Sequence, residues 1–118
     1  MREIEFRLWD KKYGCMDDYG FYIGSDGRVF QPASMTYNTP NTEIEEVKDR
    51  YILMQYTGLK DKNGVKIFEG DIVEITDGDE WVVGRKIARM DGETLNWHPQ
   101  TIGKIIGNIH ENPEIVNP

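Results

Sequence analysis

The chain has 118 residues and a formal net charge of −7, from 21 acidic and 14 basic side chains. Phosphate backbones are bound through Lys and Arg, so this balance disfavours a protein that covers nucleic acid broadly. The single cysteine, Cys15, excludes an intramolecular disulfide and suits a reducing compartment. No signal-peptide core and no apolar run of about 18 residues occur, so we expect a cytoplasmic protein without a membrane span.

The N-terminal part of the sequence contains two β-rich patterns. Residues 3–9, EIEFRLW, alternate apolar and charged side chains, which is typical of a half-buried strand. Residues 21–30 predict a hairpin, because two β-rich runs flank a turn at Ser25-Asp26-Gly27. Both patterns indicate β structure before the first proline of the chain.

The region that follows is less regular. Residues 31–42 hold two prolines and many small polar side chains, so we expect a loop there. For residues 42–50 two structures stay open. A short helix is favoured by the capping-box spacing of Thr42 and Glu45, and a strand through Ile44 is the alternative.

The remainder of the chain consists of short β-rich runs separated by turn signals. Residues 51–57, YILMQYT, are apolar on both faces as far as Gln55 and predict a central strand. Further strands are expected at residues 71–75, 80–90, 94–97 and 104–110. The C-terminal ENPEIVNP should run extended, over the surface or onto a neighbouring subunit. Several short strands at such spacing predict a mainly β protein with minor α structure, as a small barrel or sandwich.

Residues 57–73, TGLKDKNGVKIFEGDIV, concentrate turn-forming residues ahead of a strand. Asn63-Gly64 is a strong hairpin signal, since both residues tolerate left-handed conformations. Gly70 marks a second tight turn. Two reversals followed by a strand are how many small SH3-like barrels begin, which is an analogy of fold and assigns no function.

Two subdomains are therefore expected. Residues 1–50 would form an N-terminal β subdomain, with a loop at 31–42, packed against a C-terminal SH3-like barrel of residues 51–118. One continuous domain is the alternative.

The carboxylates of this central stretch are its candidate chemical groups. Asp61, Asn63, Glu69 and Asp71 offer oxygen ligands, but apolar residues occupy the later positions that a calcium loop needs. A carboxylate pair for acid–base catalysis lacks an accompanying histidine or nucleophile nearby. Turn formation explains these residues better, and we assign no catalytic, cofactor or metal residue here.

The other reactive side chains give no specific pattern. Cys15, His98 and His110 do not match a zinc-binding spacing, and nothing local supports a cysteine–histidine catalytic pair. The sequence GKIIG at residues 103–107 lacks the length and the Ser or Thr of a phosphate loop. We therefore predict no enzyme, no cofactor and no metal.

A basic strand with nearby aromatic residues is the one candidate for nucleic-acid contact. Aromatic side chains can stack on bases, and basic side chains can bind phosphates. Tyr51, Tyr56 and Trp97 are further aromatic candidates, although all of these side chains could equally belong to the core. The candidate contact residues are Trp81, Arg85, Lys86 and Arg89.

Three blocks of sequence resemble the YopX-like family of phage and prophage proteins. They are MREIEFRLWDKK at the start, QYTGLKDKNGVKIFEGDIV in the middle and IGNIHENPEI near the end, together about half of the chain. The resemblance implies a small, mostly β protein from phages or prophages of Gram-positive bacteria that forms oligomers. The family has no established biochemical function and no assigned catalytic residues, so none can be transferred.

These observations favour a non-enzymatic binding or oligomeric assembly protein of the bacterial cytoplasm. We expect a homo-oligomer, with a phage or host protein as a further partner and no membrane contact. The alternative is a nucleic-acid-binding module on an SH3-like or OB-like barrel, or an acidic mimic of DNA that acts on a host protein.

Overall fold

The structure is a computed structural model that describes residues 4–17, 21–32, 44–46, 50–79 and 81–115. The described residues form ten strands, one short helix and two 3-10 turns, so the protein is mainly β with minor α structure, as predicted. The chain divides into two compact units. One unit is Arg7–Leu53, and the other combines Met1–Phe6 with Met54–Pro118.

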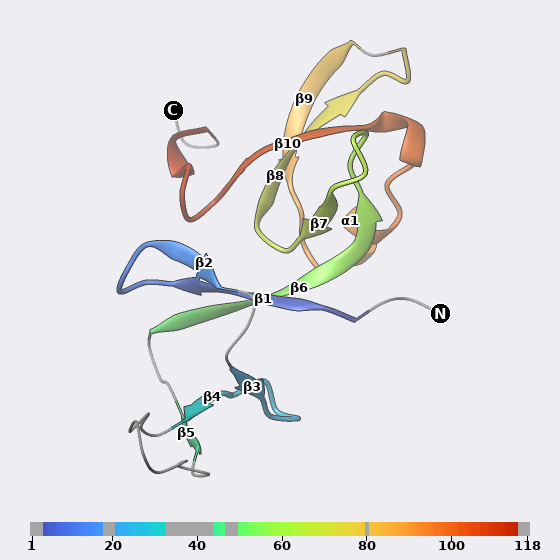
Figure 1. The fold of residues 1–118 in the computed structure, drawn as a ribbon. Helices are drawn as coiled ribbons and strands as arrows, with labels where there is room; N and C mark the ends of the chain where they lie inside the picture. Colours follow the sequence, from blue (N-terminus) through green and yellow to red (C-terminus); the bar gives the residue numbers. More distant parts are fainter. Residues whose placement is uncertain (1–3, 18–20, 33–43, 47–49, 80, 116–118) are drawn as a thin grey trace. The chain divides into compact units, whose positions relative to one another are not determined.

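The smaller unit contains a hairpin and a small antiparallel sheet (Figure 1). Strands β1 and β2 form the hairpin, and β3, β4 and β5 form the sheet in that order. The hairpin predicted at residues 21–30 is confirmed, because Gly27 N–H donates to the Gly24 carbonyl oxygen at 2.9 Å between β3 and β4. The strands are β1 Phe6–Asp10, β2 Cys15–Asp17, β3 Tyr22–Ile23, β4 Val29–Pro32 and β5 Ile44–Glu46.

The loop expected at residues 31–42 begins later than predicted. Strand β4 runs through Pro32, which is paired with Ile44 of β5. The strand alternative for Ile44 is therefore correct, whereas Thr42 of the alternative helix cap lies outside the described residues.

The remaining strands lie in the larger unit, apart from residues 51–53 at the start of β6. Strand β6 is an inner strand of a sheet with the order β2-β1-β6-β7, which confirms the predicted central strand at residues 51–57. Strand β8 lies between β9 and β10 in an antiparallel sheet (Figure 1), so the strands expected at 71–75, 80–90 and 104–110 are present. The elements are β6 Tyr51–Lys60, β7 Lys66–Phe68, β8 Asp71–Thr76, β9 Val82–Ile87, α1 Gly92–Leu95, a 3-10 turn Pro99–Thr101, β10 Ile102–Asn108 and a 3-10 turn Pro113–Ile115.

The two chain reversals predicted within residues 57–73 are also confirmed. Between β6 and β7, Asp61 N–H donates to the Val65 carbonyl oxygen at 2.8 Å, and Gly64 has a φ of 81°. Between β7 and β8, Gly70 has a φ of 86°. Glycine adopts these angles without steric cost, so two tight turns lead directly into β8.

Residues 94–97 do not form the strand that was expected. Asp91 caps the short helix α1 instead, since its Oδ1 accepts the N–H of Thr94 at 2.9 Å, and Thr94 is buried. A capped and buried first turn outweighs the weak β preference of so short a run. The extended tail is likewise wrong at Pro113–Ile115, which is a 3-10 turn, while residues after 115 lie outside the described part.

The core of the larger unit lies on one face of the β10-β8-β9 sheet. Its buried cluster draws one residue each from β7, β8, β10 and the segment after β9, and Trp97 packs against it. The helix α1 and Trp97 thus border the same sheet that ends in β9. The cluster is Ile67, Val73, Ala88 and Ile102.

Candidate functional site

Strand β9 is an edge strand with an open side. It pairs with β8 along one side, and in the order β10-β8-β9 no described strand lies on its other side. Five of its residues are exposed and the sixth, Ile87, is half-buried, whereas most of β8 is buried. An open edge presents backbone N–H and carbonyl groups that can pair with another strand.

The beginning of β9 carries an exposed apolar patch. Trp81 is 75% exposed, Val82 55% and Val83 66%. Val83 interrupts the regular pairing, because Ile75 is opposite Gly84 and the next pair along β8 includes Val82. This β-bulge and the patch lie at the loop end of the β8–β9 hairpin.

The other end of β9 is basic and borders a cavity. The cavity has a volume of about 530 Å³, and its walls include Arg85, Lys86 and Arg89, the helix α1, Trp97 and Ile115. Lys86 Nζ lies 2.9 Å from Glu93 Oε1, so its charge is compensated within the chain. Within the described residues no carboxylate pairs with the guanidinium groups of Arg85 and Arg89.

The indole N–H of Trp97 is a buried hydrogen-bond donor. Its Nε1 is buried and has no partner among the described residues. A buried N–H without an acceptor is destabilising by about 1–3 kcal/mol. The cavity is thus lined by two guanidinium groups and also by Asp91 and Glu93, while the Nε1 of the wall residue Trp97 is itself buried.

The predicted contact residues Trp81, Arg85, Lys86 and Arg89 fall into two places. The three cations line the cavity, while Trp81 lies in the apolar patch and is not a wall residue. The aromatic residue beside the cations is Trp97 instead. Tyr56, another aromatic candidate, is buried.

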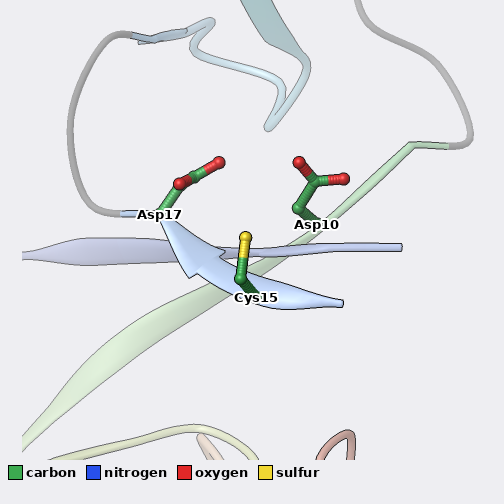
Figure 2. Close-up of side chains that lie close together, drawn as sticks. All are labelled: Asp10, Cys15 and Asp17. Atoms are coloured by element: carbon green, nitrogen blue, oxygen red, sulfur yellow. The ribbon is translucent and has the colours of Figure 1, made fainter. Parts of the chain in front are cut away.

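A second cluster of chemical groups occurs in the β1–β2 hairpin. Figure 2 shows the side chains of Asp10, Cys15 and Asp17 on the same side of the two strands. Their ligand atoms lie within 4.8 Å of one another. The register explains this proximity, because Asp10 is directly opposite Cys15, and Asp17 lies two positions along β2 on the same face.

Asp10 is already engaged by groups of the protein. Its Oδ2 accepts Arg50 Nη2–H at 3.0 Å, and its Oδ1 accepts Arg50 Nε–H and the N–H of Lys12 at 2.9 Å and Tyr13 at 3.3 Å. The hydrogen bond from Arg50 is the main cause that holds the pKa of Asp10 below its usual value. A metal ion here would have to displace Arg50, so the carboxylate serves to fasten the hairpin.

The carboxylates of residues 57–73 have the same structural use. Asp61 is buried, and its two oxygens accept the N–H groups of Asn63, Val65 and Ile105 at 2.8, 2.9 and 3.1 Å. Asp71 Oδ2 accepts the N–H of Phe68 at 2.8 Å. These bonds confirm that the turn interpretation of Asp61 and Asp71 is correct.

Sequence reasoning missed the Asp10–Cys15–Asp17 cluster. It also did not predict that Trp97 lines the cavity beside the basic residues of β9. Strand β2 has three residues, which are too few for a period to be recognised. The signal available was Gly14, which has a φ of 64° and closes the turn after Asp10. His98, which was considered as a zinc ligand, accepts the N–H of Gln100 through Nδ1 at 3.2 Å.

The described residues define a small, mainly β protein in which β9 is an exposed edge strand. A family model described as YopX protein matches residues 5–117, and the chain therefore belongs to the YopX family. It is similar to protein EF1440 from Enterococcus faecalis, whose crystal structure shares 28% identity and a TM-score of 0.60 over 98% of this chain and 99% of that chain. No curated protein matches the chain. None of the helices in the described ranges is long and apolar enough to cross a membrane.

Proposed function

We propose that the protein is a non-enzymatic binding protein that accepts a strand of a partner protein along β9. One observation carries this proposal: β9 is an edge strand that begins in the exposed apolar patch of Trp81, Val82 and Val83. A partner strand adds to such an edge through main-chain hydrogen bonds, and side-chain contacts supply the specificity. The patch provides the apolar area that a stable contact needs.

The use of the buried carboxylates supports a role without catalysis. Asp10, Asp61 and Asp71 are bound to backbone N–H groups or to an arginine. Each already stabilises a turn. The YopX resemblance and the lone Cys15 support action in the cytoplasm of a bacterial host that carries a phage or prophage.

Val83→Lys tests the proposed function, because it places a charge in the patch without touching the core. Val65→Lys is the matched control, since Val65 is 53% exposed in the turn between β6 and β7. Tagged wild-type protein and both variants are incubated with extract of a host strain, and bound proteins are quantified by mass spectrometry. We expect the wild type and Val65→Lys to retain the same partner, including a second copy of this chain, and Val83→Lys to lose it. Equal retention by all three proteins would contradict binding at β9.

A second candidate function, binding of single-stranded nucleic acid, is favoured by the cavity beside β9. Phosphates would bind Arg85 and Arg89, and a base could stack on the indole of Trp97, which lines the cavity. A filter-binding titration with an oligothymidylate at low salt tests this function. Arg85→Glu/Arg89→Glu should abolish binding, while Lys60→Glu/Lys62→Glu makes the same charge change at exposed positions outside the cavity. No retention of the oligonucleotide by the wild type would exclude this candidate.

A further inference from the structure

We propose that the strand accepted along β9 is an extended segment of another protein in which two carboxylates flank an apolar side chain at alternate positions. This inference rests on the proposed function of β9 as a binding edge. It names the chemistry of the partner segment, which the open edge alone does not determine.

The cavity of about 530 Å³ lies along the open side of β9. Successive side chains of a strand point to opposite faces, and Arg85, Lys86 and Ile87 are successive residues that all line the cavity. One side of the strand is paired with β8, so a cavity that contacts both faces lies at the other side. A strand added to this edge would therefore run along the cavity.

The side chains along this edge alternate between basic and apolar. Arg85 and Ile87 share one face of β9, and Arg89 follows two positions later in the wall of the same cavity. The wall thus presents one apolar side chain between two guanidinium groups. Because side chains directly opposite each other in paired strands are in contact, the matching pattern in a partner is carboxylate, apolar residue, carboxylate at alternate positions.

The carboxylates of the protein around this edge are already engaged. The guanidinium groups of Arg85 and Arg89 are not paired with a carboxylate of the described residues. Arginine binds a carboxylate through two parallel N–H groups, so each of these two side chains is suited to one acidic residue of a partner. The engaged carboxylates are Asp91, which caps α1, Glu93, whose Oε1 lies 2.9 Å from Lys86 Nζ, and Glu74, whose Oε1 lies 4.0 Å from Lys104 Nζ.

A peptide segment fits this edge better than a nucleic acid does. The open side of β9 offers main-chain N–H and carbonyl groups, which pair with another main chain and have no counterpart in a phosphate backbone. The exposed Val82 and Val83 lie at the other end of β9 and can contact apolar residues further along the same segment. The net charge of −7 opposes a long polyanion, whereas two carboxylates require only two guanidinium groups.

Fluorescence anisotropy titrations with labelled synthetic peptides test the proposal. The probe is a short β-prone peptide in which two glutamates flank a valine at alternate positions, and a comparison peptide has lysines in place of the glutamates. We expect the wild type to bind the glutamate peptide about tenfold or more tightly than the lysine peptide. Arg85→Glu/Arg89→Glu should reverse this preference, because the wall of the cavity is then acidic.

Two controls separate strand pairing from a general effect of charge. Lys60→Glu/Lys62→Glu makes the same charge change at exposed positions outside the cavity and should keep the wild-type preference. A glutamate peptide with a methylated main chain keeps its charges but loses N–H donors, and it should no longer bind. Circular dichroism checks that each variant is folded.

Four results would overturn the proposal. They are a wild type that does not bind the glutamate peptide, a preference that Arg85→Glu/Arg89→Glu leaves unchanged, equal binding of the methylated peptide, and tighter binding of an oligothymidylate than of the glutamate peptide. The last result would assign the two arginines to nucleic acid.

The two proposals fail in different ways. If Val83→Lys loses its partner from extract but the wild type does not bind the glutamate peptide, β9 remains a binding edge for a segment of different chemistry. If Val83→Lys loses no partner and the glutamate peptide does not bind, both proposals are wrong.

Discussion

Strands β8 and β9 are neighbours in one sheet and have six residues each, yet they have opposite environments. Ile72 and Val73 of β8 are fully buried, while Val82 and Val83 of β9 are more than half exposed. Strand β8 has a partner on both sides, and β9 has one. The same β-branched residue types are therefore buried in one strand and exposed to solvent in the other.

The largest difference between β8 and β9 is expected when one apolar side chain in each strand is truncated. Ile72→Ala should lower the free energy of unfolding by about 3 kcal/mol, because it removes buried area and leaves a cavity. Val82→Ala in β9 should change it by less than about 0.5 kcal/mol. Urea titrations followed by circular dichroism measure both values. Similar costs for the two variants would show that β9 is packed as β8 is.

Two aspartates extend the comparison to two turns, one between β6 and β7 and one between β8 and β9. Asp61→Ala should lower the free energy of unfolding by about 2 kcal/mol, since it leaves the N–H groups of Asn63, Val65 and Ile105 without their acceptor. Asp77 in the exposed β8–β9 loop accepts the N–H of Asp79, its one bond among the residues described there, and Asp77→Ala should cost less than about 0.5 kcal/mol. The same urea titrations apply. An Asp61→Ala variant as stable as the wild type would rule out the proposed fastening role.

A third prediction concerns the effect of acid on the buried carboxylate of Asp10 in β1. Arg50 holds the pKa of Asp10 below its usual value of 3.8, so the folded state binds a proton there less readily than the unfolded chain. The stability that Asp10 contributes is therefore complete above about pH 5 and is lost as the pH falls through the lowered pKa of the folded state. Unfolding free energies of the wild type and Asp10→Asn, measured against pH, should differ by a constant amount near neutrality and converge in acid. A difference that grows in acid would contradict this sign.

The smallest change in the free energy of unfolding is expected for Val83→Lys, the variant designed to block binding at β9. Val83→Lys should leave the free energy of unfolding within about 0.5 kcal/mol of the wild type, because the side chain is largely exposed. Thermal and urea unfolding at low protein concentration, where copies are apart, measure this. A loss of several kcal/mol would mean that Val83 belongs to the fold and is not a contact residue.

The local turns of this protein were predictable, and the arrangement of its strands was not. Gly64 and Gly70 signal their turns because few other residues take their backbone angles. The strand expected at 94–97 was wrong because the side chain of Asp91 caps a helix there, a local contact that competes with residue preference. Neighbouring patterns in the sequence do not tell which strand will be at an edge.

The candidate site shows the same division. The basic residues of β9 were recognised from sequence as a group. The sequence does not show, however, which of Trp81 and Trp97 is exposed and which packs against the core. Only the fold places Trp81 in solvent and Trp97 against the core. Likewise, Asp10 and Cys15 come together through a hairpin whose second strand is too short to predict.

The division of the chain into units has a consequence for synthesis on the ribosome. The larger unit includes residues from the start of the chain as well as Met54–Pro118. Glu5 is held there by Lys66 Nζ, 2.6 Å from its Oε2, and by the N–H of Tyr56, which donates to its carbonyl oxygen. The last strand of this unit is β10. The smaller unit, Arg7–Leu53, is encoded between these parts and emerges whole before most of the larger unit has been translated. Since units of this kind tend to fold as they emerge, the smaller one can fold first, while the β10-β8-β9 sheet is completed only after β10 has left the exit tunnel.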